Sequence, residues 1–375
     1  MSGEPAPIPN DALLAELRLS LVPGVGPRIR HRLIERFGSA RAALEAPPSA
    51  LREVEGVRAK VLDELLASAS SSEAETELAI CREQNVKIVP ISGPGYPPLL
   101  REIYDPPGLL FVRGSLEPQD GLAVAIVGTR HATQYGLRSA ARLAESLARA
   151  GLTIVSGLAR GIDGAAHRGA LAAGGRTVAV LAGGVLKIYP PEHQELAAEI
   201  LQHGALVSEA PSDTIIHGGM FPQRNRVISG LSLGVIVVEA GDRSGALITA
   251  RHAMEQGREV FAVPGRVEDR SSWGCHQLLR DGAKLVQSAD DVLEELGPLF
   301  TPTPSDAGRV VHHPAELQLN ELEQQVLDAI ETDPTTIDQI VGTTGLPVPR
   351  VLSTVSVLEM RRLIRRTSGS SVMRL

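Results

Sequence analysis

Four short glycine-rich turns contain or adjoin residues that could bind an anion: 128–130, 156–163, 182–190 and 241–245. Small residues let backbone N–H groups approach a phosphate closely, and neighbouring arginine or lysine side chains supply positive charge. Each turn directly follows an apolar run of strand length. Together they predict a groove that binds several phosphates; the alternative is that they only connect strands to helices.

Arg224 and Arg226, with Asn225 between them, lie at or near the start of a predicted helix. Two guanidinium groups beside the free N–H groups of a helix start form a phosphate-binding cluster. The alternative is that an arginine pairs with Glu209 or Glu239 and holds strand ends together. Both roles are compatible, one for each arginine.

Motifs for common nucleotide cofactors are missing from the sequence. The first turn continues Gly128-Thr-Arg-His-Ala-Thr instead of G-x-G-x-x-G, and there is no G-x-x-x-x-G-K-[ST]. The ten histidines are scattered without the spacing of a zinc site. We therefore expect neither a cofactor nor a metal.

Two apparent catalytic signals have simpler explanations. Gly230-Leu-Ser-Leu-Gly234 matches G-x-S-x-G, but its serine lies between a helix and the following strand, the reverse of a nucleophile elbow. Asp163 could be a general base, yet its place just before a predicted helix favours an N-cap. We expect no catalytic residues, and hence no enzyme.

The positioning elements are strands and helices that alternate over residues 122–287. Predicted strands are 123–127, 153–155, 177–181, 205–208, 234–239 and 259–263, and predicted helices are 136–150, 163–173, 191–202, 222–231 and 245–256. Continuous apolar strands are typical of a parallel sheet that is buried on both faces. The predicted fold class is α/β, a doubly wound, Rossmann-like, mostly parallel sheet. Ligands bind such sheets beyond the carboxyl ends of the strands, where the four turns would lie.

The predicted domains are a helical domain at 1–85, an extended Rossmann-like domain at 86–296, a linker at 297–316 and a winged helix at 317–375. In the first, Pro23–Pro27 precedes Arg28, Arg30, Arg32, Arg36 and Arg41 and resembles a helix-hairpin-helix, with a second copy near residues 54–58. This hairpin either contacts DNA or is a structural turn. In the winged helix, acidic residues nearly match basic ones, so a protein contact is at least as well supported as duplex binding.

Composition limits the possible classes of protein. A chain of 375 residues with 43% hydrophobic and 22% charged residues is globular and too long for one ordinary domain. The net charge of −7 argues against nucleic-acid binding over the whole surface but allows a local basic site. No apolar stretch reaches about 20 residues, there is no secretory signal, and two cysteines cannot form a disulfide framework. We expect a cytoplasmic protein with no membrane contact.

The ordered set of segments is specific. The segments, in chain order, are Ile126–Arg130 with Tyr135-Gly136, Ser156–Asp163, Tyr189-Pro190, Phe221–Gly230, Val237–Ala240 with Ser244-Gly245 and Thr249-Ala250, and Val263–Gly265. Together they resemble the DNA-processing protein A family, DprA or Smf. The resemblance covers residues 90–290 strongly. It extends more loosely to a SAM-like or helix-hairpin-helix domain before them and a winged helix after them.

The resemblance implies a non-enzymatic protein that binds single-stranded DNA, forms a homodimer and loads the RecA recombinase during natural transformation and homologous recombination. Single-strand-binding protein is a further candidate partner. Arg130, Lys187 and the segment Arg224–Arg226 would bind phosphates, and the other turn residues would shape the groove. The expected DNA-binding residues are Gly128, Thr129, Arg130, Ser156, Gly157, Ala159, Gly161, Lys187, Phe221, Arg224, Asn225, Arg226, Ser244, Gly245 and Thr249.

The chain also departs from the family pattern. Leu186 replaces an expected acidic residue, His193 replaces asparagine, and no lysine is found near His217. Backbone donors and arginines suit the phosphates of a single strand, because no predicted helix offers side chains for reading a major groove. Few aromatic residues argue against extensive base stacking; Tyr135 and Phe221 are the nearby candidates.

Two other classes of function compete with this interpretation. A Rossmann-like nucleoside-monophosphate hydrolase would need a P-G-G-x-G-T-x-x-E turn, and the segment 181–187 lacks its glutamate. The other alternative is a scaffold with a vestigial groove whose terminal domains bind proteins.

Overall fold

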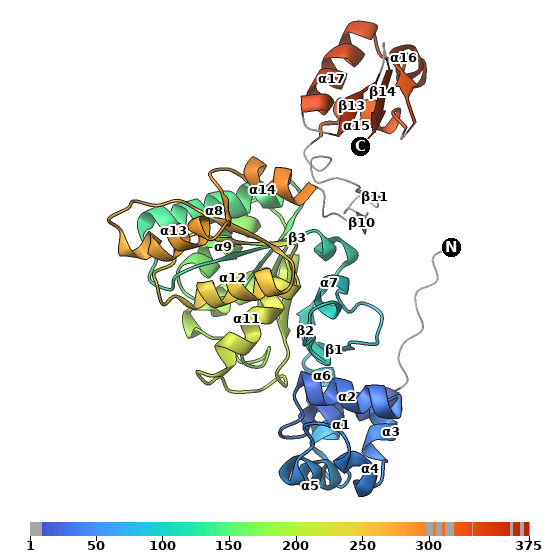
Figure 1. Cartoon of the computed structure of the whole chain (residues 1–375), viewed down its shortest axis with the longest axis vertical. Helices are drawn as coiled ribbons and strands as arrows, with labels where there is room; N and C mark the ends of the chain where they lie inside the picture. Colours follow the sequence, from blue (N-terminus) through green and yellow to red (C-terminus); the bar gives the residue numbers. More distant parts are fainter. Residues whose placement is uncertain are drawn as a thin grey trace.

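A computed structural model describes residues 10–297, 303–304, 310–311, 319–331, 333–360, 363–367 and 371–374 (Figure 1). The helices before the main sheet are α1 (Asn10–Leu21), α2 (Pro27–Phe37), α3 (Ala40–Leu44), α4 (Pro48–Arg52), α5 (Ala59–Ser68) and α6 (Glu73–Glu83). Among the described residues, no helix combines the length and apolar character that crossing a bilayer requires.

The central sheet has nine strands within the described residues, in the order β1-β2-β6-β5-β4-β3-β7-β8-β9. They are β1 (Val86–Pro90), β2 (Leu109–Gly114), β3 (Ala123–Val127), β4 (Thr153–Ser156), β5 (Thr177–Val180), β6 (Gly204–Ser208), β7 (Gly234–Val237), β8 (Glu259–Ala262) and β9 (Lys284–Leu285). Strands β3 to β9 are parallel, whereas β1 and β2 join antiparallel at one edge. The chain builds outward from β3 to β6 and then returns to β7 beside β3. The predicted doubly wound α/β fold is confirmed.

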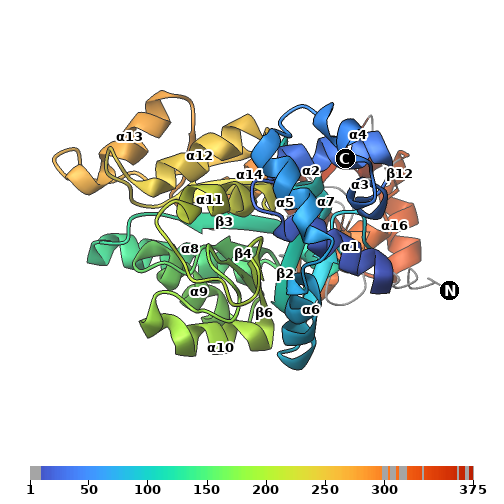
Figure 2. The ribbon, with the colours of Figure 1, turned by 90° about the horizontal axis from the view of Figure 1, so that it is seen from below.

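Helices cover both faces of this sheet (Figure 2). One face carries α8 (Gln134–Arg149), α9 (Ile162–Ala172), α10 (Gln194–His203) and α14 (Ala289–Leu296), and the other carries α11 (Met220–Gly230), α12 (Gly245–Glu255) and α13 (Trp273–Arg280). Alternate residues of β3 enter different cores: Val124 and Ile126 pack with α8, and Ala125 and Val127 pack with α11 and α12. This burial on both faces explains why the strands are continuously apolar.

Strand and helix boundaries differ by a few residues from those predicted. β7 ends at Val237 instead of residue 239, and α8 begins at Gln134 because Thr133 caps it through the Gly136 N–H group. Ser232 lies between α11 and β7, as predicted, and donates to the Ile228 carbonyl at 2.9 Å. It is therefore not placed on a nucleophile elbow.

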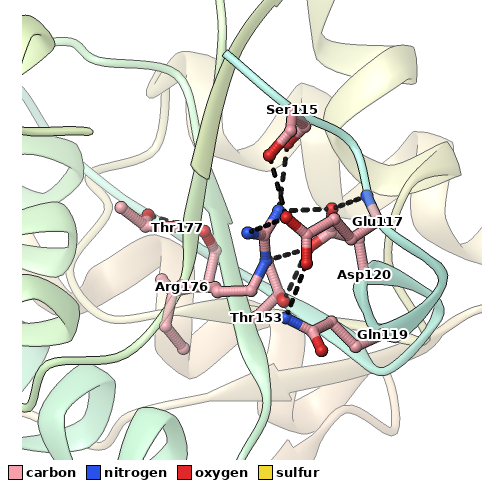
Figure 3. Close-up of polar contacts among 8 residues, drawn as sticks. Ser115, Glu117, Gln119, Asp120, Thr153, Arg176 and Thr177 are labelled. Carbon is pink, nitrogen blue, oxygen red and sulfur yellow. Dashed lines mark hydrogen bonds and ion pairs between the residues drawn. The ribbon is translucent and has the colours of Figure 1, made fainter. Parts of the chain in front are cut away.

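A charged network ties the amino ends of the strands together, at the edge opposite the four turns (Figure 3). Arg176 donates to both carboxylate oxygens of Asp120 at 2.9 Å and pairs with Glu117 at 3.1 Å. Asp120 also accepts from the Thr153 hydroxyl at 2.9 Å. The guanidinium is thus paired with two carboxylates, which assigns it to structure rather than to anion binding.

The N-terminal helices contain the two hairpins that the sequence predicts. Gly24 and Gly56 both have φ in the left-handed region, +87° and +95°. In each turn the same backbone bond forms, from Val25 N–H to the Val22 carbonyl and from Val57 N–H to the Val54 carbonyl. Equal geometry at both positions confirms the internal repeat.

The C-terminal unit has a winged-helix outline. Its helices are α15 (Glu321–Asp328), α16 (Ile337–Thr344) and α17 (Val348–Met360), and its sheet order is β12-β14-β13, from β12 (Thr335–Thr336), β14 (Ser371–Arg374) and β13 (Ile364–Arg366). The predicted terminal hairpin is confirmed, because β13 and β14 pair antiparallel. Most of the predicted linker at 297–316 lies outside the described residues.

Candidate nucleic-acid interface

A cavity of about 720 Å³ lies at the carboxyl ends of β3, β4 and β7. Between β3 and β7 the strand order reverses, because the helices that follow these strands cover opposite faces of the sheet. Such a switch point leaves a crevice in which ligands bind. The first, second and fourth predicted turns contribute to the lining, together with α11 and the start of α13.

The first turn brings a cation to the cavity. A Cβ at Gly128 would lie 2.4 Å from Cγ1 of Ile162, so this position requires glycine. The Thr129 N–H group donates to the Glu239 carbonyl at 2.7 Å and fixes the turn to the end of β7. Arg130 is exposed, and its guanidinium carbon lies 4.4 Å from the ring centroid of Phe221.

The second turn is held by a buried pair of charges beneath it. Arg224 donates to the carbonyl groups of Gly157, at 2.6 Å, and Val180, and burial lowers its pKa to about 10. Asp163 accepts from the N–H groups of Gly157 and Ala159 at 3.2 and 3.3 Å, and burial raises its pKa. A Cβ at Gly157 would meet the Arg224 guanidinium at 2.3 Å. Arg224 lines the cavity, but its hydrogen bonds are used to position this loop.

The expected N-cap role of Asp163 is wrong. α9 begins at Ile162, and its N-cap is Gly161. Gly161 has a φ of +73°, and a Cβ at this residue would lie 2.3 Å from the Thr129 carbonyl oxygen. Asp163 is therefore in the first turn of the helix and binds the preceding loop. Ser156 is buried and donates to the Ile126 carbonyl at 2.6 Å, which ties β4 to β3.

The three residues of the cluster on α11 have different roles, and that of Arg224 is to hold the second turn. Arg226 turns away from the cavity, pairs with Glu209 at 2.5 Å and donates to the Asp105 carbonyl at 2.7 Å. Asn225 lines the cavity and donates to the Gly245 carbonyl at 3.2 Å, which joins α11 to the fourth turn. The ion-pair alternative is thus confirmed for Arg226 with Glu209.

The sequence also offered Glu239 as an ion-pair partner for Arg224 or Arg226. In the structure Glu239 pairs with neither arginine. It is buried and accepts from the Thr133 N–H group and hydroxyl at 2.8 and 2.9 Å, and from the Ser271 hydroxyl at 2.7 Å. Strand β7 ends two residues before it, so its side chain joins the start of α8 to the loop after β8. Its role is to position the cavity walls.

The fourth turn begins α12. Ser244 caps this helix by accepting from the Ala246 N–H group at 3.3 Å, and Gly245 and the buried Thr249 line the cavity. The exposed Arg243 comes from the same turn.

Lys187, in the third turn, is not among the residues that line the cavity. Its ammonium group pairs with Asp213 at 2.8 Å, and its side chain is 49% exposed. His193, which departs from the family pattern, is buried with Nδ1 2.9 Å from the Leu158 carbonyl oxygen. Leu186 donates its N–H to the Ser212 carbonyl at 2.9 Å, so this turn is fixed without the expected acidic residue.

Ten residues that line the cavity are not among the predicted site residues, and the arginine and tryptophan side chains among them are Arg243, Arg270 and Trp273. Arg243 is part of a turn that the sequence identifies. Arg270 and Trp273 follow β8, the neighbour of β7, so extending the carboxyl-edge rule by one strand would have found them. Within the described residues, Arg130, Arg243 and Arg270 have no carboxylate at ion-pair distance, unlike Arg176 at the opposite edge.

The arrangement can hold anions at this edge. Three exposed guanidiniums line the same cavity as the N-terminal ends of α9, α11, α12 and α13, where the helix dipoles place partial positive charge. A separate pocket of about 30 Å³ shares Arg130 and Phe221 with the cavity and is also lined by Arg160 and Tyr189. No group of three or more potential metal ligands occurs in the part of the chain that the structure describes.

The predicted helix-hairpin-helix offers less free charge. Arg30, Arg32, Arg36 and Arg41 pair with Glu16, Glu55, Glu53 and Glu45, respectively. Arg28 lies over the ring of Tyr104, with 4.8 Å between the guanidinium carbon and the ring centroid. These pairs favour the structural alternative for this hairpin.

Comparisons with known proteins agree for all three parts of the chain. The family model described as DNA recombination-mediator protein A matches residues 87–297, a DprA-like N-terminal HHH domain matches 10–80, and a DprA winged helix domain matches 311–370. Protein Smf of Synechocystis is 34% identical over 94% of this chain and 96% of its own length. DNA processing protein DprA of Bacillus subtilis is 49% identical over 58% of this chain and 74% of its length.

Two solved structures are similar. That of DNA processing protein A from Streptococcus pneumoniae is 37% identical, with a TM-score of 0.66 over 75% of this chain and 95% of that one. A structure of DNA processing protein A from Helicobacter pylori, which concerns its single-stranded DNA binding mode, is 32% identical, with a TM-score of 0.50 over 54% of this chain and 92% of that one.

Proposed function

We propose that this chain, which belongs to the DNA recombination-mediator protein A family, binds single-stranded DNA in the cavity at the carboxyl edge of its sheet. Membership of the family makes it a DNA-processing recombination mediator. In the proposed role it protects incoming single strands and loads RecA during natural transformation and homologous recombination. It acts by binding, without breaking a covalent bond.

The observation that carries this proposal is the excess of unpaired cations at one cavity. Arg130, Arg243 and Arg270 are exposed on its walls and have no carboxylate partner among the described residues. Isolated cations at a crevice attract a polyanion, whereas cations in ion pairs are largely neutralised. The ssDNA-binding homologue from Helicobacter pylori supports the same choice of ligand.

The shape of the cavity favours a single strand over a duplex. Its hydrogen-bond donors are arginines and N–H groups in the loops at the carboxyl ends of the strands. None of the helices that line it projects as a recognition helix for a major groove. An unpaired strand can bend into a crevice, with phosphates on the cations. Ser156, Gly161 and Arg226 would then support the site without touching DNA, and Lys187 would bind a phosphate outside the cavity after leaving Asp213.

The remaining parts of the proposal concern assembly. RecA is the proposed recombinase partner, single-strand-binding protein a further one, and the chain is proposed to act as a homodimer. The exposed edge strand β9, where Leu285 is 50% exposed, supports an association between copies.

Substitution of Arg130 tests the proposal. Arg130→Ala should weaken binding of a fluorescent dT strand, because it removes an unpaired cation that contacts phosphate. The slope of log affinity against log salt should decrease in magnitude by about 0.7 for each phosphate that the variant no longer neutralises. Fluorescence anisotropy at several salt concentrations measures both quantities, with a duplex of equal length as the competing ligand.

Arg149→Ala is the matched control. Arg149 ends α8, far from the cavity that the start of this helix adjoins, and it pairs on the surface with Glu145. Its removal should leave affinity unchanged. Equal affinities of Arg130→Ala and wild type, or tighter binding of duplex than of dT, would contradict the proposal. Release of base or phosphate from nucleoside monophosphates in a parallel assay would favour the hydrolase alternative.

A further inference from the structure

We propose that Trp273 forms a base-stacking subsite at the β8 side of the cavity, so that the strand is held through a base there as well as through its phosphates. This inference rests on the proposed function and adds a residue that contacts a nucleobase to a site whose phosphate contacts come from cations. It starts from two observations: Trp273 lines the cavity, and its side chain is 42% exposed although it is the largest apolar residue type.

The indole is held in a defined orientation. Its Nε1–H group donates to the Val267 carbonyl at 3.1 Å, so the polar edge of the ring is bound to protein. Trp273 begins α13, and the next residue, Gly274, donates its N–H to the Ala240 carbonyl at 2.8 Å. A Cβ at Gly274 would lie 2.7 Å from that oxygen, so glycine permits this close approach. A ring fixed in this way loses little conformational entropy when a base stacks on it.

The loop before Trp273 is also fixed to the cavity. The Ser271 hydroxyl oxygen lies 2.7 Å from a carboxylate oxygen of Glu239 and 2.7 Å from one of Asp269, and its single proton is shared between these two acceptors. Glu239 is the same buried carboxylate that binds Thr133 at the start of α8. One side chain therefore sets the distance between the first turn and the wall that carries Trp273.

The cavity has an arginine beside an aromatic ring at each end. On the β4 side, the guanidinium carbon of Arg130 lies 4.4 Å from the ring centroid of Phe221. On the β8 side, the guanidinium carbon of Arg270 lies 5.8 Å from that of Trp273. Proteins that bind single strands combine cations along the backbone with aromatic platforms for the bases. The arrangement of these four side chains has that composition, and it points to a nucleobase as the group bound at Trp273.

The chain provides its own probe, because Trp273 is its one tryptophan. Stacking of a base on an indole quenches the indole fluorescence, so a titration with dT strands should quench the intrinsic emission. The quenching should saturate at the concentration at which anisotropy reports binding. An abasic deoxyribose-phosphate strand of equal length should bind through its phosphates and leave the emission nearly unchanged.

Substitutions separate stacking from structure. Trp273→Ala should weaken binding of dT by about 5- to 150-fold, the range expected for one stacked base, and leave the affinity for the abasic strand unchanged. Trp273→Phe retains an aromatic face and should recover most of the affinity for dT. The matched control is Tyr104→Ala, which removes an aromatic ring that is 81% exposed and lies beside Arg28, outside the cavity.

Each outcome decides between the two proposals. Binding of dT without quenching, or an equal loss of affinity for dT and abasic strands in Trp273→Ala, would overturn the stacking subsite and leave the proposed function intact. If the wild-type protein binds neither strand, the proposed function itself fails, and the subsite with it. Thermal unfolding of the variants shows whether each one is folded.

Discussion

At the residue scale, buried charges support the candidate interface, and exposed charges line its cavity. Arg224 is buried and directs its donors to the carbonyls of Gly157 and Val180, whereas Arg130 is exposed on the wall of the cavity. A buried guanidinium without such acceptors would be costly, so Arg224 and Asp163 act together as a support for the second turn. The phosphate contacts are therefore expected from Arg130, Arg243 and Arg270.

His167 gives a residue-scale prediction on pH. The Thr177 hydroxyl donates to the Ile154 carbonyl at 2.7 Å, so the His167 Nδ1–H group must donate to Thr177 Oγ1 at 2.7 Å. Nε2 is then a buried acceptor without a partner among the described residues. Burial lowers the pKa of His167 to about 3, below its unfolded value near 6.5.

Because the unfolded chain binds the extra proton, stability should fall as the pH falls from about 6.5 towards 3, by about 1.4 kcal/mol for each pH unit. The variant His167→Gln removes this titration. Urea unfolding at several pH values should give a steeper loss of stability for wild type than for His167→Gln. Parallel pH profiles of the two proteins would show that His167 does not titrate in this way.

At the scale of elements, ion pairs join the two N-terminal hairpins to each other. Arg32 reaches the Glu55 carbonyl at 3.0 Å and its carboxylate at 3.1 Å, and Arg36 pairs with Glu53. These bonds join α2 to the loop between α4 and α5. The two hairpins therefore brace each other, and their arginines are directed at protein.

We predict that the double variant Arg32→Ala, Arg36→Ala binds single-stranded DNA with the affinity and salt dependence of wild type. Exposed ion pairs contribute about 0–1 kcal/mol each, so the loss of stability should be small. Anisotropy with dT strands checks the first expectation, and urea unfolding checks the second. A marked loss of affinity with a shallower salt dependence would instead assign DNA contact to this hairpin.

For the molecule as a whole, the N-terminal helices and the sheet share a hydrophobic cluster. Leu17 of α1 and Cys81 of α6 pack in the same cluster as Phe111 of β2 and Leu196 of α10. A buried bond reinforces this packing: the Ser212 N–H group donates to the Glu77 carboxylate at 2.7 Å. The N-terminal helices thus pack against the sheet across the predicted division at residue 85.

Glu77→Ala should lower the free energy of unfolding of the whole chain by about 1–3 kcal/mol, because it leaves the buried Ser212 N–H group without its acceptor. Urea unfolding of the full chain measures this decrease. Glu75→Ala on the same helix is the matched control, since Glu75 is exposed and pairs with Arg18 on the surface. Equal effects of the two substitutions would show that the Glu77 bond does not contribute.

The sequence alone determined the order of the elements, the doubly wound fold and the end of the strands at which the candidate site lies. These follow from local causes: apolar runs buried on both faces, helix periodicity, and glycines where a Cβ would collide, as at Gly128 and Gly161. Ordered motifs also sufficed for the resemblance to the family, which the comparisons confirm.

Only the tertiary structure decided which charged groups remain free. Arg224 and Arg226 are two residues apart, yet Arg224 holds the second turn while Arg226 pairs with Glu209. Lys187 pairs with Asp213 and does not line the cavity. Trp273 and Arg270 join the site from beyond β8 because parallel strands end at a common edge. The physical reason is that pairing and burial depend on neighbours brought from distant parts of the chain, and the spacing of residues along the sequence does not specify them.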